Sequence, residues 1–222
     1  QALAAGILLI YGIQILWLPI NGVITLPPSI GQLVTVLIVL VTINAVNFID
    51  GLDGLAAGIV AIAGAAFFTF AYLLAVVWGF SRAGAPSLMT AVLIGICLGF
   101  LPHNFHPARI FMGDSGSMFL GLLLASAAIT LTGQVDPNAI TAVEVGPTLL
   151  PLLLPFAVLA IPLADLVLAI ARRLRAGRSP FAPDKDHLHH RLLAAGNSHV
   201  RTAVIMYLWT ATLAFPITIS AF

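Results

Sequence analysis

Two acids and two amides recur at intervals of three residues, directly after a long apolar stretch of the chain. They are Asn44, Asn47, Asp50 and Asp53. A spacing of three residues moves each side chain about 60° round a helix axis, so that Asn47 and Asp50 share one face. Acids and amides at a helix end that faces water are suited to ligate Mg²⁺ or to hold a nucleotide base or ribose. Helix capping with a solvated loop is the alternative, but it needs fewer polar groups than these.

A second polar segment lies between two later apolar stretches, at 102–117. Near its end, Gly-Asp114-Ser-Gly forms a tight polar turn that opens the next helix. The free N–H groups and the dipole of a helix N-terminus attract phosphate, and Asp114 is suited to hold a hard cation that bridges phosphates. Capping by Asp114 or Ser115 is the alternative, and a serine protease is disfavoured by the hairpin context. The histidines of this segment, His103 and His106, are expected to be structural.

The third polar segment, 172–191, begins with arginines and ends with histidines and one more arginine. Anchoring at a membrane surface explains the arginines at its start. A short helix is predicted after Asp184. On this helix His187, His190 and Arg191 share one face, because they are spaced at i, i+3 and i+4. That face is suited to bind phosphates, and Zn²⁺, which prefers three or four N, S or O ligands, is the alternative.

Membrane-spanning helices must carry these clusters. The chain of 222 residues is 60% hydrophobic and 8% charged, with a mean hydropathy of +1.10, whereas soluble domains carry about 25% charge. Cys97 is the only cysteine, which excludes an intrachain disulfide. A helix needs about 20 apolar residues to cross the bilayer. We therefore predict an all-α, polytopic bundle that forms a single transmembrane domain, 1–222, with seven spans at about 1–19, 31–48, 56–79, 86–102, 117–133, 147–171 and 202–221.

Basic residues are unevenly shared between the two sides of this bundle. Eight of the nine lie in the loops 49–55, 103–116 and 172–201, and the opposite loops hold only Arg82. Loops rich in Lys and Arg stay in the cytoplasm, so the three polar clusters are predicted to meet at the cytoplasmic face. A transporter or proton channel, the rival class, needs polar groups through the midplane. A catalytically inactive scaffold is the other rival, and the intact Asp and His motifs argue against it.

In this order, the three clusters resemble the motifs of the polyprenyl-phosphate N-acetylhexosamine-1-phosphate transferases, glycosyltransferase family 4. The resemblance covers essentially the whole chain and rests on Asn44-x-x-Asn47-x-x-Asp50-Gly-x-Asp53-Gly-Leu, Asn104-x-His106-Pro-Ala-x-x-Phe111-Met-Gly-Asp114-Ser-Gly-Ser and Asp184-x-x-His187-x-His189-His190-Arg191-Leu. The third motif is similar to that of the branch using UDP-N-acetylglucosamine (UDP-GlcNAc) or a related UDP-amino sugar. The lipid I translocase branch carries a Phe-Glu pair after its histidines, which is absent here.

The resemblance implies transfer of an N-acetylhexosamine 1-phosphate, first of all GlcNAc 1-phosphate, from a UDP-sugar to undecaprenyl phosphate with release of UMP. This is the first membrane step of cell-surface glycans such as lipopolysaccharide O-antigen or wall teichoic acid. It implies Mg²⁺, with Mn²⁺ as a substitute, held by Asp114 and Asn47. The implied catalytic residues are Asp50, Asp53, Asp114, His187, His189 and His190. The implied substrate-binding residues are Asn44, Asn47, Asn104, Phe111 and Arg191, with Phe111 stacked on uracil.

The resemblance also implies a multi-pass protein of the bacterial inner membrane whose active site faces the cytoplasm. The expected partners are the UDP-amino sugar, the polyprenyl phosphate and the bilayer. A homodimer is left open, and nucleic acid is not expected. Family members have ten spans, and this chain resembles spans four to ten without the family's first Asp-rich motif. We therefore expect it to lack its N-terminal part and to be inactive by itself.

Overall fold

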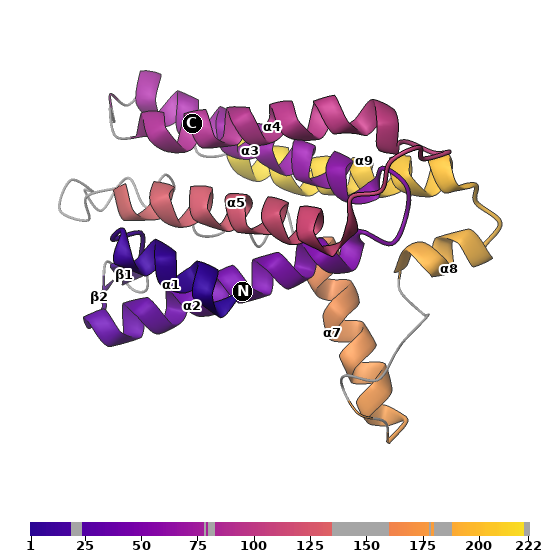
Figure 1. The fold of residues 1–222 in the computed structure, drawn as a ribbon, viewed down its shortest axis with the longest axis horizontal. Coiled ribbons are helices and arrows are strands. Elements are labelled where there is room, and N and C mark those ends of the chain that lie inside the picture. Colours follow the sequence, from indigo (N-terminus) through magenta and orange to yellow (C-terminus); the bar gives the residue numbers. More distant parts are fainter. Residues whose placement is uncertain are drawn as a thin grey trace.

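Long helices side by side make up the core of the protein. The structure, a computed structural model, describes residues 1–18, 24–77, 79, 83–134, 160–177, 179 and 188–219. Within these residues, five helices are long and apolar enough to cross a membrane. They are α2 (Pro28–Ile49), α3 (Leu55–Val76), α4 (Gly84–Asn104), α5 (Gly113–Gln134) and α9 (His199–Ile219), which form one bundle (Figure 1). The prediction of a polytopic helical membrane protein is confirmed at this level.

Shorter elements flank the bundle. They are α1 (Ala2–Ile10), β1 (Trp17–Leu18), β2 (Ile24–Thr25), α7 (Ala160–Arg175) and α8 (Leu188–Ala194). The two strands pair antiparallel, and they are the only strands among the described residues. α7 points away from the bundle (Figure 1) and carries three arginines in its last turn. It covers part of the span predicted at 147–171, and the first half of that span lies outside the described residues.

The prediction of one helical span over 1–19 is wrong. α1 is nine residues long, about 14 Å at 1.5 Å per residue, and the chain then turns at Gly12, whose φ is +75°. The extended segment that follows is fixed by a hydrogen bond from the Ile15 N–H to Oγ1 of Thr35, at 2.9 Å. Ile15 and Trp17 are almost fully buried. Non-helical backbone at membrane depth is tolerated when protein covers it, and hydropathy alone does not reveal such cover.

α3 is the central helix, in contact with α2, α4, α5 and α9. Most of its residues are buried, and many of them are Ala or Gly. Small residues let helix backbones approach closely where the hydrophobic effect gives little driving force. At Gly58 the ring of Tyr207 from α9 fills the place that a Cβ would take. This close packing fixes the start of α3 relative to α9.

The connections that carry the polar clusters meet at one end of the bundle, which we call the site end. The α2–α3 turn, the α4–α5 loop and α8 all lie there, at the right of Figure 1. The turn is possible because Gly54 adopts a left-handed conformation, with φ of +76°, which costs glycine nothing. The Gly54 N–H then donates to Oδ1 of Asn104 at 3.1 Å. This hydrogen bond from the backbone of the turn to the Asn104 side chain joins the first two clusters.

Candidate active site

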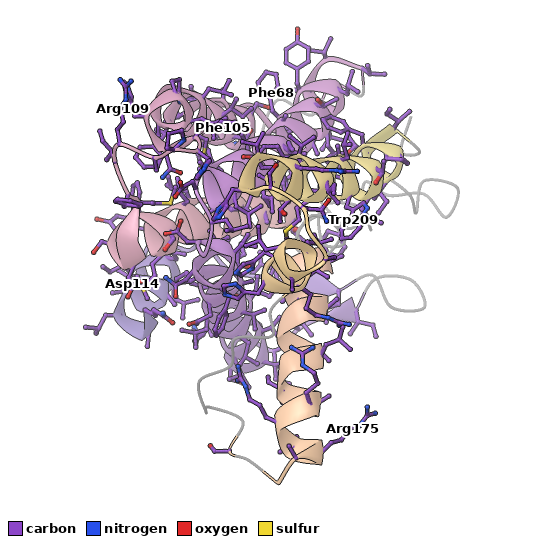
Figure 2. All side chains as sticks on the ribbon, turned by 90° about the vertical axis from the view of Figure 1, so that its right-hand side faces the viewer. Phe68, Phe105, Arg109, Asp114, Arg175 and Trp209 are labelled. Atoms are coloured by element: carbon purple, nitrogen blue, oxygen red, sulfur yellow. The ribbon has the colours of Figure 1, made fainter. Side chains whose placement is uncertain are left out.

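A polar cavity of about 270 Å³ opens at the site end, between the α2–α3 turn and the α4–α5 loop. Figure 2 looks onto this end, where Asp114 lies on one side of the view. The volume is close to the lower limit of about 300 Å³ for small-molecule sites. The cavity brings acids of the first and second clusters together, and its lining residues are Asp50, Gly51, Leu52, Asp53, Asn104, Phe111, Met112, Gly113 and Asp114.

Asn47 joins α2 to the first turn of α5 beside this cavity. Its Nδ2 donates to Oδ1 of Asp114 at 3.2 Å and to Oγ of Ser117 at 2.9 Å. The buried Ser117 hydroxyl donates in turn to the carbonyl oxygen of Gly113 at 3.1 Å. Asn47 therefore holds the Asp114 carboxylate in place, and its role as a metal ligand stays a prediction. Sequence reasoning missed Ser117, although its position three residues after Asp114 places both on one side of α5.

Asp50 lies half-buried at the end of α2, in the same cavity as Asp114. No described group donates a hydrogen bond to its carboxylate. Burial, together with the nearby negative charge of Asp114, raises the pKa of Asp50 to about 6. The unfavourable charge pair would be relieved by a cation or by protonation. This is the strongest electrostatic sign that the cavity is built for a positively charged or metal-bound ligand.

Asp53, three residues later, accepts two hydrogen bonds from other groups of the protein. Its Oδ2 accepts hydrogen bonds from Nδ1 of His106 at 2.8 Å and from the N–H of Ala108 at 3.1 Å. Burial alone would raise the pKa of this carboxyl. The two hydrogen bonds and the nearby His106 and His199 outweigh burial and hold the pKa below its usual value. His106, expected to be structural, therefore touches a predicted catalytic residue.

Asn104 and Phe111 bound the cavity on the side of the α4–α5 loop. Asn104 is buried, and both ends of its amide bind backbone groups: Oδ1 accepts from Gly54, and Nδ2 donates to the carbonyl oxygen of Ile110 at 2.9 Å. Asn104 therefore links the α2–α3 turn to the α4–α5 loop. Phe111 is 74% exposed, so a large part of its ring is open to a ligand. Their predicted contacts with uracil stay predictions.

The third cluster reaches the cavity through His189. This residue is buried, and its ring lies directly over Gly51, where an added Cβ would stand only 2.7 Å from Nε2. His190 is exposed, and its ring packs against that of His189 with centroids 4.3 Å apart. This contact brings the third cluster to the α2–α3 turn, whose residues line the cavity together with those of the α4–α5 loop. Sequence spacing predicted the clusters but not that a histidine ring would press on a glycine.

Two predicted residues lie away from this arrangement, and a third is not among the described residues. Asn44 hydrogen-bonds to Oε1 of Gln1 at 2.8 Å and to the carbonyl oxygen of Leu40 at 2.7 Å, so its amide bridges α1 and α2. Arg191 lines an apolar groove between α7, α8 and α9. His187 lies outside the described residues. Their predicted roles in substrate binding and catalysis stay predictions.

The donor set fits a hard cation better than Zn²⁺. Among the described residues, no group of three or more His, Cys, Asp or Glu side chains is placed to hold a metal ion. Zn²⁺ needs three or four such ligands, whereas Mg²⁺ uses one or two carboxylates and takes its other oxygens from phosphates and water. Asp50 and Asp114 supply two carboxylates to the same cavity. The residues present therefore fit Mg²⁺ that is bound together with a phosphate-bearing substrate.

Comparison with known proteins gives a consistent result. The profile of the family described as glycosyl transferase family 4 matches residues 1–132. A decaprenyl-phosphate N-acetylglucosaminephosphotransferase of Mycobacterium tuberculosis is 48% identical over 220 residues, which are 97% of this chain and 54% of that protein. A probable undecaprenyl-phosphate N-acetylglucosaminyl 1-phosphate transferase of Bacillus subtilis is 40% identical over 120 residues, 54% of this chain and 30% of that protein.

A third relative is more distant. The undecaprenyl-phosphate alpha-N-acetylglucosaminyl 1-phosphate transferase of Escherichia coli is 33% identical over 132 residues, 58% of this chain and 32% of that protein. The chain spans about half the length of the mycobacterial relatives that it matches over nearly its whole extent.

Proposed function

The chain belongs to glycosyl transferase family 4, and from this premise we propose that it transfers GlcNAc 1-phosphate from UDP-GlcNAc to a polyprenyl phosphate and releases UMP. An oxygen of the lipid phosphate attacks the β-phosphorus of the nucleotide sugar, and the bond from that phosphorus to the bridging oxygen of UMP breaks. The bond between the sugar and its phosphate stays intact. The product is a lipid-linked sugar pyrophosphate.

One observation carries this proposal: two polar clusters from distant parts of the chain line one cavity with acids and a helix N-terminus, and a third cluster packs on its wall. Asn47 binds Asp114, and His189 packs on Gly51. A structural explanation by helix capping requires neither contact. A path through the membrane would need charged groups along the bundle, whereas the described acids of this site lie in the turns at one end.

Catalysis of this reaction depends mostly on positioning and on neutralising charge, because two anions must approach each other. Mg²⁺, when bound, supplies positive charge to the phosphate oxygens at the reacting centre. Asp114 would hold it, with Asp50 near. Asn47 fixes the Asp114 carboxylate and is itself held by Ser117, so little reorganisation is needed when the ion binds. The raised pKa of Asp50 means that its ionised form is disfavoured in this cavity, and a bound cation would stabilise that form.

The donor nucleotide would lie in the polar cavity. Phe111 offers an exposed ring on which a base can stack. The first turn of α5 begins at Gly113, and its backbone N–H groups and dipole favour a phosphate there. On the other side of the cavity, the exposed His190 and the helix that carries it would approach the pyrophosphate. The chain's own groups would thus hold the base, the phosphates and the cation at separate points.

The acceptor is proposed to be a polyprenyl phosphate. The mycobacterial relatives that match nearly all of this chain are named for decaprenyl phosphate, whereas the Bacillus subtilis and Escherichia coli relatives, of lower identity, are named for undecaprenyl phosphate. We therefore favour decaprenyl phosphate over undecaprenyl phosphate as the acceptor. A comparison of initial rates with the two lipids at equal detergent mole fraction would decide this point.

We also propose that the site end faces the cytoplasm of a bacterial inner membrane, because eight of the nine basic residues lie in the segments 49–55, 103–116 and 172–201, which the charge distribution along the sequence assigns to that side. A cysteine at exposed Ala85, at the opposite end of α4, should react in intact cells with an impermeant thiol reagent. A cysteine at exposed Ala195, after α8, should react only after permeabilisation. The native Cys97 is buried and gives little background. Labelling of Ala195→Cys from outside would overturn the orientation.

The test of the function uses the full-length protein in detergent with radiolabelled UDP-GlcNAc, Mg²⁺ and polyprenyl phosphate. The proposal expects label in the lipid fraction and an equal amount of UMP. UDP-N-acetylgalactosamine and UDP-glucose serve as alternative donors. No lipid product with any of these donors, from protein that still binds UDP, would contradict the proposal.

A further inference from the structure

The carboxylate of Asp53 is held on one side only. Both of its described hydrogen bonds, from Nδ1 of His106 at 2.8 Å and from the N–H of Ala108 at 3.1 Å, end on the same oxygen, Oδ2. No described group donates to Oδ1. Since Asp53 also lines the polar cavity, one oxygen is committed to the protein, and the other is left for a ligand. A carboxylate fixed in this way is a hydrogen-bond acceptor of defined direction.

His106 is itself held by a second histidine. Its ring stacks on that of His199, with centroids 4.6 Å apart and planes inclined by 12°. His199 is the first residue of α9, whereas His106 belongs to the α4–α5 loop and Asp53 to the α2–α3 turn. The stack fixes the plane of the His106 ring, and the bond to Asp53 fixes its rotation in that plane. Three connections of the site end are thus joined through one side chain.

Stability alone is a weak explanation for this arrangement. The side chain of His106 is 40% exposed and that of Asp53 is 23% exposed. Ion pairs at such exposed positions contribute little to folding. The geometry has another effect, because it removes rotational freedom from a carboxylate at the cavity wall. Such preorganisation acts on ligand binding rather than on folding.

We propose that His106 is a positioning residue for Asp53 in the donor site, and that His199 keeps His106 in place. This inference rests on the proposed function. Asp53 lies on the cavity wall with Phe111 and Asn104, so the ligand group that it accepts from is a hydroxyl or N–H of the nucleoside part of the UDP-sugar. Loss of His106 therefore weakens donor binding and leaves acceptor binding unchanged.

Kinetics of four single variants of the full-length protein test this inference. His106→Ala should raise KM for UDP-GlcNAc about tenfold, the effect of losing one hydrogen bond to a charged group, with KM for the polyprenyl phosphate unchanged. His106→Asn should restore KM to within about threefold of the wild type, because the amide nitrogen of Asn stands close to the place of Nδ1. His199→Phe keeps a stacked ring and should behave like the wild type, unlike His199→Ala.

His103→Ala is the matched control, since His103 is an exposed histidine in the last turn of α4, just before the α4–α5 loop, and its KM values should not change. Equal KM for His106→Ala and His106→Asn, or equal increases for donor and acceptor, would overturn the inference. So would a fall in melting temperature with KM unchanged.

A proton NMR measurement separates this inference from the proposed function. A downfield imidazole N–H signal should be present in the wild type and in His103→Ala and lost in His106→Ala and Asp53→Asn. Its absence from the wild type would refute the pairing even if the enzyme is active. Absence of any transfer by a wild type that shows the signal would instead refute the proposed function.

Discussion

Asp50 and Asp53 lie three residues apart at the α2–α3 turn, yet the folded protein shifts their pKa values in opposite directions. Asp53 has two donors on one oxygen, and its pKa is held below the usual value although burial acts against this. Asp50 shares its cavity with Asp114, and its pKa is raised to about 6 by burial and by that neighbour. The protein supplies two donors to one oxygen of Asp53, whereas no described group donates to the Asp50 carboxylate.

The difference shows how a membrane enzyme can use acids at its surface for two purposes. A carboxylate that must orient a substrate is stabilised in its ionised form by fixed donors. A carboxylate that must bind a cation is better left with few hydrogen-bond donors in the free protein, because the cation then stabilises its ionised form by a larger amount. Motif spacing alone treats the two acids of the turn as equivalent, so the following substitutions are chosen to separate them.

The largest effect is expected from Asp114→Asn. This change keeps the size of the side chain and removes the charge that would hold Mg²⁺, so turnover should fall by about 10²–10³-fold or more. The measurement is the initial rate of lipid product across a Mg²⁺ titration, with the melting temperature as the control for folding. Near-normal turnover by folded Asp114→Asn protein would remove Asp114 from the proposed mechanism.

A smaller loss is expected from Gly51→Ala. The new Cβ would stand 2.7 Å from Nε2 of His189, so the histidine or the turn must shift. Misplacement of about 1 Å at a reacting site costs up to about 10²-fold, and we expect a decrease of roughly tenfold in kcat/KM. The matched control is Gly99→Ala in α4, where a Cβ meets nothing within 4 Å. An equal result for both variants would show that the contact of α8 with the turn does not matter.

The smallest effects concern stability, and they should have opposite signs for the two acids. The pKa of Asp50 is raised from 3.8 to about 6 in the folded protein. The folded protein therefore becomes less stable as the pH rises through that interval, and the full destabilisation remains at higher pH. Asp50→Asn should therefore raise the melting temperature by a few degrees more at pH 8 than at pH 4.5, in EDTA. The partial exposure of Asp50 keeps this effect small.

Asp53 is the counterpart in the same measurement. Its lowered pKa means that its stabilising contribution is present above its unfolded pKa and is lost as the pH falls through the folded value. The usual pKa of Asp53, 3.8, lies below pH 4.5. Asp53→Asn should therefore lower the melting temperature by about the same amount at pH 8 and at pH 4.5, and by less once the pH falls below 3.8. The same sign of the pH dependence for both variants would contradict the contrast between the two acids.

The sequence predicted the helical membrane bundle and the clusters at its connections, because hydropathy and polar punctuation depend on local composition. The prediction from sequence was wrong over 1–19, where apolar residues form a short helix followed by an extended segment that protein covers. It also missed the roles of Ser117, His106 and His199. Those contacts join elements far apart in the chain, and no spacing rule within one element contains them.

The central claim, that this chain carries the site of a sugar-phosphate transfer, is tested most directly by a double-label experiment. The donor is UDP-GlcNAc with ³H in the sugar and ³²P in the β-phosphate, and the full-length protein is supplied with Mg²⁺ and polyprenyl phosphate. Attack on the β-phosphorus must carry both labels into the lipid in equal amounts, and Asp114→Asn must abolish both. A lipid product that holds ³H alone, with ³²P left in UDP, would contradict the account, since the sugar would then have moved without its phosphate.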